Sequence, residues 1–184
     1  VEGRGAYTAV NGERTTMEPG DYIITPSWTW HDHGNDSPDP MVWLDVLDVS
    51  TVAHFHGQFR EEWEEERYPV NRPEGDALAR YGAGLLPIDY RPTGATSPIF
   101  NYPYARTRDS LYRMSRAGDP DPHFGYKLKY INPVNGDWAM PTIATTMQWL
   151  PKGFASRTYQ STDGLGFVCV EGTSETRVTL PDGS

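Results

Sequence analysis

Closely spaced turn signals divide the first part of the chain into short segments, and this spacing constrains the fold more than any other feature. Asn11-Gly12, a strong two-residue hairpin turn, joins the strand-like segments 6–10 and 14–17. Pro19-Gly20-Asp21 then turns the chain into the apolar run 22–25. Short strands separated by Gly and Pro are typical of an all-β sandwich or barrel, and we expect that fold class here.

Two histidines, His31 and His33, stand one residue apart soon after these turns. Side chains alternate between the two faces of a strand, so both imidazoles are predicted to lie on one face and Asp32 on the other. A further strand is expected over 41–49, with Asp45 on one of its faces. Two imidazoles on one face begin a metal site, but they do not complete a ligand set.

The pattern changes after about residue 50. Helices are predicted over 59–66 and 107–117, the second ending at Gly118. The stretch between them is rich in Pro and Gly and has little periodicity. Strand patterning returns over 126–131 and 141–150.

A short internal echo indicates a duplicated architecture. Val1-Glu2-Gly3 opens the chain, and Val170-Glu171-Gly172 follows the strand-like run 166–170 near its end. Cys169, the only cysteine, lies in that run and is predicted to be a packed core thiol. The sequence therefore indicates three parts: the later half of one β-domain over 1–50, a connector over 51–125, and the first half of a second β-domain over 126–184.

Composition excludes several function classes. The formal net charge of −9 leaves no basic patch for a nucleic acid. No stretch approaches the roughly 20 apolar residues of a membrane span, and no signal peptide pattern is present. The single cysteine fits a reducing, cytoplasmic setting. The acidic run 61–66 is interpreted as a solvated helix face rather than a cation site.

Several motifs of the chain occur together in one known family. They are Val1-Glu2-Gly3-Arg4-Gly5, Asn11-Gly12-Glu13-Arg14, Pro19-Gly20-Asp21, Trp28-Thr29-Trp30-His31-Asp32-His33-Gly34-Asn35, Trp43-Leu44-Asp45, Tyr102-Pro103-Tyr104, Pro141-Thr142-Ile143 and Leu150-Pro151-Lys152-Gly153. On these motifs the chain resembles the gentisate 1,2-dioxygenase family, which includes the salicylate and 1-hydroxy-2-naphthoate dioxygenases.

The resemblance implies a bicupin, which has two double-stranded β-helix (jelly-roll) domains in one chain, here incomplete at both ends with a few short helices in the connector. It also implies a non-haem Fe(II) held by three histidines in the first cupin, and a homotetramer. The implied reaction opens the ring of an aromatic 2-hydroxy acid with O2, between the hydroxyl- and carboxyl-bearing carbons. Gentisate is the expected substrate, with salicylate and 1-hydroxy-2-naphthoate as alternatives. Iron suits imidazole ligands with open positions.

The resemblance also implies a role for each candidate residue. By motif position His31 is the third iron ligand, and the other two come from an upstream His-x-His motif that this sequence does not contain. His33 is expected to be a catalytic pocket residue that binds substrate, and Asp45 to line the same pocket. The segment 151–170 contains no histidine, so the second cupin is interpreted as a non-metal domain.

Other readings of the sequence stay open. His54 and His56 form a second His-x-His pair, which with His31 and His33 would give four ligands for a zinc-like site. Alternatively, these two are ordinary surface or hydrogen-bonded histidines. His123 is interpreted as a loop residue. The chain itself could also be a non-catalytic cupin fragment or a sugar- or small-molecule-binding module. Trp28 and Trp30 are most simply core or interface aromatics.

Overall fold

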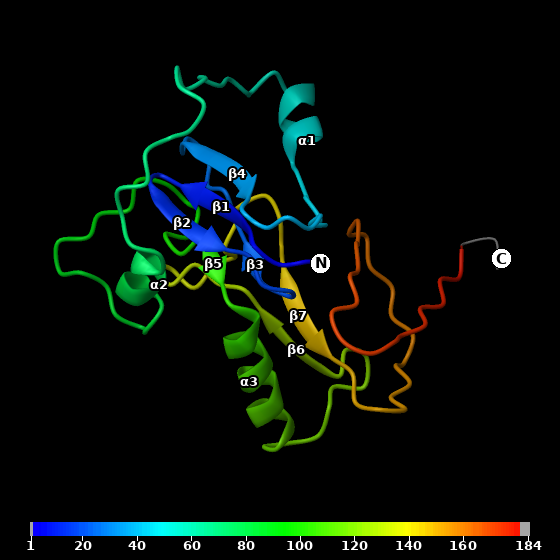
Figure 1. Ribbon diagram of the computed structural model, residues 1–184. Coiled ribbons are helices and arrows are strands. Elements are labelled where there is room, and N and C mark those ends of the chain that lie inside the picture. The colour runs from blue at the N-terminus through cyan, green and yellow to red at the C-terminus, as the bar shows by residue number, and fades with distance from the viewer. Residues whose placement is uncertain (1, 181–184) are drawn as a thin grey trace.

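The computed structural model describes residues 2–180 and contains three small antiparallel sheets and three helices (Figure 1). The largest sheet has the order β2-β1-β4, with β1 at Ala6–Val10, β2 at Glu13–Thr16 and β4 at His31–Asn35. Its central strand β1 is buried throughout. This sheet contains both candidate histidines.

The predicted hairpin between β1 and β2 is confirmed. Asn11 and Gly12 both have positive φ, 46° and 82°, as a two-residue turn with the right-handed strand twist requires. Asn11 also accepts the backbone N–H of Trp30 through its side-chain oxygen at 3.0 Å. The turn residue therefore fixes the start of β4 as well as the hairpin.

Two smaller sheets lie beside the first. Strand β3 (Tyr22–Ile23) pairs with β5 (Asn101–Tyr102), and β6 (Tyr126–Lys129) pairs with β7 (Thr146–Trp149). The strands β6 and β7 lie within the segments expected from the sequence. The rings of Tyr22, Tyr102 and Tyr130 pack together with centroids 4.6 to 5.6 Å apart. They adjoin the buried core of Val10, Ile24, Ala77, Phe100, Tyr130 and Ala139.

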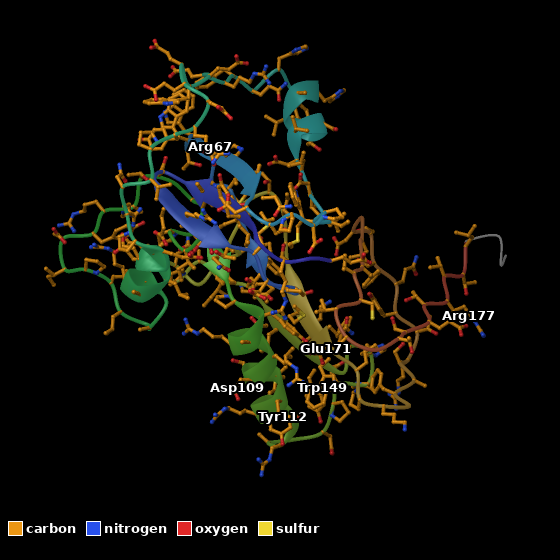
Figure 2. All side chains as sticks on the ribbon, in the orientation of Figure 1. Arg67, Asp109, Tyr112, Trp149, Glu171 and Arg177 are labelled. Carbon is orange, nitrogen blue, oxygen red and sulfur yellow. The ribbon has the colours of Figure 1, made fainter. Side chains whose placement is uncertain are left out.

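Residues 2–180 include three helices, α1 (Val49–His54), α2 (Asp76–Tyr81) and α3 (Tyr104–Ser115). Only α3 corresponds to a helix predicted at its position. Helix α3 begins three residues before its predicted start because the carboxylate of Asp21 accepts the Tyr104 N–H at 2.8 Å. It packs on the β6–β7 hairpin, where the rings of Tyr112 and Trp149 stack 6.2 Å apart (Figure 2). None of the helices in the described part of the chain is long and apolar enough to cross a membrane.

The helix predicted over 59–66 is wrong, because this segment has only bends and irregular structure. The glutamates at 61, 62, 65 and 66 would place like charges four residues apart on a helix, which is unfavourable. The aromatic side chains of the segment pack against the loop before β4 instead. Trp63 contacts Trp30 at 5.1 Å and Phe59 contacts Trp28 at 4.8 Å between ring centroids. Both tryptophans thus make aromatic contacts, although Trp28 is 65% exposed.

Two predicted strands are also wrong. In 41–49 only Val42 pairs, through a bridge to Glu2, and most of the segment is exposed. The run 166–170 has no regular structure, and Cys169 is exposed rather than in a core. An apolar run becomes a strand only where another strand supplies hydrogen-bond partners for its backbone. Neither segment lies beside a strand that pairs with it along its length. Val1, which opens the first copy of the repeated Val-Glu-Gly motif, lies outside the described residues.

Candidate active site

Strand β4 holds the two histidines of the motif side by side. It pairs antiparallel with β1, which places His33 opposite Thr8 and His31 opposite Val10. The two imidazole rings approach edge to face, with centroids 5.7 Å apart. The prediction that both side chains lie on one face of a strand is confirmed.

Asp32 points to the other side of β4, as the strand alternation requires. One of its carboxylate oxygens accepts the backbone N–H of Tyr68 at 3.3 Å. The other is buried and has no hydrogen-bond partner among the described residues. The strand alternation does not extend upstream of His31, because Trp28 has a left-handed backbone with φ of 60° and the strand begins only at His31.

His33 makes more side-chain contacts than His31 does. Its Nδ1 lies 2.9 Å from the Thr8 hydroxyl, and its ring centroid lies 5.9 Å from that of Trp43. Burial and then the neighbouring His31 lower the pKa of His33, while Asp45 and Asp32 act in the opposite direction. The lowered pKa keeps this imidazole neutral at pH 7, so it can both accept and donate a proton.

Asp45 lies in the irregular segment after β4, not on a strand, and its side chain is exposed. Its charge nevertheless acts on the pKa of His33. The structure therefore brings Asp45 near His33 although the strand predicted to carry it does not form.

His31 is exposed, and its Nδ1 lies 3.3 Å from the backbone oxygen of Thr29. A proton on Nδ1 would be donated to that carbonyl, which leaves Nε2 unprotonated. Metal-binding histidines commonly use this arrangement, in which a backbone carbonyl fixes the tautomer. His31 is therefore suited to bind a metal ion through Nε2.

Thr8 and the pair Tyr7–Gly34 are features of the site that the sequence patterns did not single out. Thr8 is 1% exposed, so its hydroxyl is available only to groups packed directly against it, such as the His33 ring. A Cβ on Gly34 would lie 2.5 Å from the buried Tyr7 ring, so β4 approaches β1 closely only with glycine at this position. The β1–β4 register would have revealed both, since it places Thr8 opposite His33 and Tyr7 opposite Gly34.

Comparison with known proteins identifies the domain that carries these histidines. A family model described as Cupin domain matches residues 1–47, which include all of β1, β2, β3 and β4. The chain is 52% identical over 178 residues to gentisate 1,2 dioxygenase 1 of Aquipseudomonas alcaligenes, which covers 97% of this chain. The chain is therefore homologous to gentisate 1,2-dioxygenases over nearly all of its own length.

Further similar proteins are also dioxygenases of this kind. A gentisate 1,2-dioxygenase of Ralstonia sp is 36% identical over 97% of the chain. Among solved structures, salicylate 1,2-dioxygenase of Pseudoaminobacter salicylatoxidans, in adducts with gentisate, has a TM-score of 0.70 and 28% identity over 79% of this chain and 42% of that one. The chain covers 51% and 49% of the lengths of the two gentisate dioxygenases, and so spans about half of these relatives.

Within residues 2–180, no three His, Cys, Asp or Glu side chains gather closely enough to hold a metal ion. The four-histidine alternative is therefore not formed: His54 ends helix α1, and His56 follows it with a φ of 52°. The family's iron fits His31 by its chemistry and tautomer, but this chain supplies only part of a ligand set. His123 lies in a loop, as predicted, where its Nδ1 is 3.3 Å from the Arg157 carbonyl oxygen.

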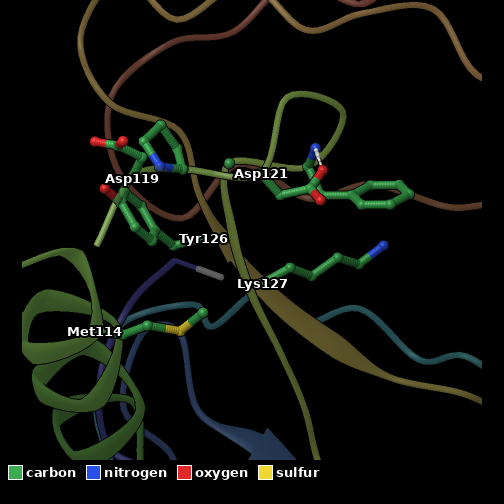
Figure 3. A pocket seen from close by; sticks show the side chains of 8 residues that line it. Met114, Asp119, Asp121, Tyr126 and Lys127 are labelled. Carbon is green, nitrogen blue, oxygen red and sulfur yellow. Dashed lines mark hydrogen bonds between the residues drawn. The ribbon is translucent and has the colours of Figure 1, made fainter. Parts of the chain in front are cut away.

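A separate pocket lies between the end of α3 and strand β6 (Figure 3). Asp119, Asp121 and Lys127 give it polar side chains, and Met114 and Tyr126 also line it. One Asp121 oxygen accepts the backbone N–H groups of His123 and Phe124 at 2.8 and 3.0 Å. This carboxylate therefore stabilises its own turn, and the pocket contains none of the predicted site residues.

Proposed function

We propose that the full-length protein is a ring-cleaving, Fe(II)-dependent dioxygenase that acts on an aromatic 2-hydroxy acid, with gentisate as the first candidate. The observation that carries this proposal is the 52% identity to a gentisate dioxygenase over 97% of the chain, a region that includes His31 and His33. Salicylate and 1-hydroxy-2-naphthoate are the alternative substrates, since relatives named for related acids also match.

In this proposal His31 contributes one iron ligand through Nε2, and two further histidines come from outside this sequence. Fe(II), when bound, supplies open coordination positions for substrate and dioxygen. No other residue of the chain is assigned to the metal.

His33 and Asp45 are the proposed pocket residues. The Thr8 hydroxyl engages Nδ1 of His33, so Nε2 is the nitrogen left to bind substrate and to exchange a proton with it. The neutral imidazole that follows from its lowered pKa suits this role. Asp45, whose charge acts on His33, is proposed to line the same pocket.

The domain organisation and assembly are part of the same proposal. Residues 1–50 belong to the metal-binding cupin, 51–125 to the connector and 126–184 to the first part of a second, non-metal cupin. The matched cupin model and the helices of the connector fit the first two assignments, and the β6–β7 hairpin fits the third. A homotetramer in the cytoplasm is the expected assembly and location.

Oxygen uptake by the full-length protein tests the function. Purified protein reconstituted with Fe(II) is given gentisate, salicylate and 1-hydroxy-2-naphthoate in separate reactions, and bound iron is measured in the same samples. The proposal expects iron binding and oxygen consumption with at least one of the acids, accompanied by the absorbance of a ring-opened product. Protein that binds no iron and consumes no oxygen with any acid would instead be a non-catalytic cupin module.

A further inference from the structure

A second cavity, of about 470 Å³, lies between helices α2 and α3 and strand β6. Cavities that bind small organic molecules have volumes of roughly 300 to 1,000 Å³. Neither His31 nor His33 lines this one. This cavity is therefore separate from the histidine site.

The walls of the cavity are largely apolar. Leu78 of α2, Leu128 of β6, Ile99 and Ile131 contribute aliphatic surface, and Tyr102 adds an aromatic ring. The Tyr102 hydroxyl donates to Ile131 and contacts Ser97 at 2.8 and 2.6 Å, which fixes the ring. A rigid apolar wall of this kind favours a ligand with an apolar or aromatic body.

The charges at the cavity are all positive. Arg106 and Lys129 line it, and none of its lining residues is Asp or Glu. The protein as a whole carries a net charge of −9, whereas the lining of this cavity has two cationic side chains and no acidic one. An apolar ligand that carries a negative charge would match this lining.

Arg106 is available to bind such a charge. Its guanidinium donates to the backbone oxygen of Gly82 at 3.0 Å and forms no ion pair with any carboxylate of residues 2–180. Arg108, two residues along the same helix, is by contrast bound to Glu171 at 2.9 Å. The bond to Gly82 positions the guanidinium and leaves most of its five donors free.

Tyr130 provides a second polar group in the lining. Its side chain is 6% exposed, and its hydroxyl is buried with no hydrogen-bond partner within the described part of the chain. The Thr107 side chain, which also lines the cavity, lies near enough to influence this hydroxyl. Tyr130 and Thr107 thus add hydroxyl-bearing side chains to the largely apolar wall.

We propose that this cavity binds a small monocarboxylate with an apolar body, its carboxylate held by Arg106 and its body packed against Leu78, Ile99 and Leu128. The ligand can be an aromatic acid or a short aliphatic acid, since both share this chemistry. Benzoate and hexanoate distinguish the two sources. Benzoate also lacks the 2-hydroxyl through which the proposed substrates would chelate iron.

Isothermal titration calorimetry of the full chain with benzoate and hexanoate tests the proposal. Benzyl alcohol serves as an uncharged probe of the size of benzoate. At least one of the acids should bind, about tenfold more tightly than benzyl alcohol, because a charge-assisted hydrogen bond to Arg106 is lost with the alcohol. Equal binding of acid and alcohol, or no binding of either acid, would overturn the proposal.

Three variants locate the site. Arg106→Gln should weaken binding of the acid about tenfold, while Arg113→Gln, which removes the same charge from the same helix outside the cavity, should leave it unchanged. Ser110→Trp, at an exposed position that lines the cavity, should block the acid by filling space. Binding that survives both Arg106→Gln and Ser110→Trp would place the acid elsewhere and refute the assignment.

Discussion

The hydroxyl of Thr8 lies 2.9 Å from Nδ1 of His33, across the pairing of strands β1 and β4. Thr8 is 1% exposed, whereas His33 keeps a solvent-exposed side, so the contact joins a buried strand to an open site. Because Nδ1 is engaged, the angle of the His33 ring is set by a residue 25 positions earlier in the chain. Asn11, in the hairpin turn after β1, exchanges hydrogen bonds with Trp30 just before β4, and these bonds fix the register of β4 against β1.

Replacing Thr8 tests its role in the proposed reaction. Thr8→Val keeps the shape of the side chain and removes the hydroxyl, so it should lower kcat about tenfold or more while bound iron stays unchanged. Thr8→Ser, which restores the hydroxyl, should recover most of the activity. Rates and iron content of the reconstituted full-length protein give the answer. Equal losses in the valine and serine variants would mean that the hydroxyl has no part in positioning His33.

The two histidines of β4 should respond differently to replacement. His31→Ala should abolish both iron binding and ring cleavage, because it removes a proposed ligand. His33→Ala should retain iron and lose turnover by about 100-fold or more, since its proposed role is in proton transfer. Iron analysis of both variants separates the roles. Iron retained in His31→Ala, or lost equally in the two, would contradict the assignment.

Gly34 should be intolerant of even one added methyl group. A Cβ there would lie 2.5 Å from the Tyr7 ring, which is buried and has the Arg14 guanidinium 4.0 Å above it. Gly34→Ala should therefore destabilise the fold by about 1–3 kcal/mol through overpacking. Gly94→Ala, where a Cβ meets nothing within 4 Å, is the control. Chemical unfolding of both variants would show this difference, and equal stability would mean that β4 shifts freely.

The first sheet could be predicted closely from the sequence because its signals are local. Asn11-Gly12 determines a two-residue turn, and strand alternation then places His31 and His33 on one face. The contact between Thr8 and His33 could not be predicted in the same way, because it depends on the pairing of β4 with β1, which no local sequence pattern indicates. Helix α3 was predicted to within three residues at its start, and the difference comes from a distant carboxylate, Asp21.

The failed predictions share a physical cause. Residues 41–49 and 166–170 have strand-like composition, but a strand also needs a neighbouring backbone, and Val42 alone finds one. The segment 59–66 has residues that favour a helix, but its clustered glutamates would repel one another there. Its aromatic side chains pack against Trp28 and Trp30 instead. Local propensity is overridden in each case by partners distant in the sequence.

Glu13 connects the first sheet to the connector and should make stability depend on pH. Its side chain is almost fully buried, and its carboxylate accepts the Ala77 N–H of helix α2 at 2.9 Å and lies 3.4 Å from the Arg72 guanidinium. Burial raises the pKa of Glu13 above 4.5, although the Ala77 N–H and Arg72 oppose that shift. The folded state therefore holds this proton more tightly than the unfolded state does.

The sign of the pH effect follows from this difference. The contribution of a group with a raised pKa is fully present below its unfolded value, here about 4.5, and is lost as pH rises through the folded value. Glu13→Gln cannot lose a proton, so its free energy of unfolding relative to the original protein should increase between pH 4 and pH 7. Urea unfolding at several pH values measures this, with Glu61→Gln, an exposed position, as the control for removal of one charge. A stability difference that stays constant with pH would show that the Glu13 carboxylate is held as an ion as readily in the folded state as in the unfolded chain.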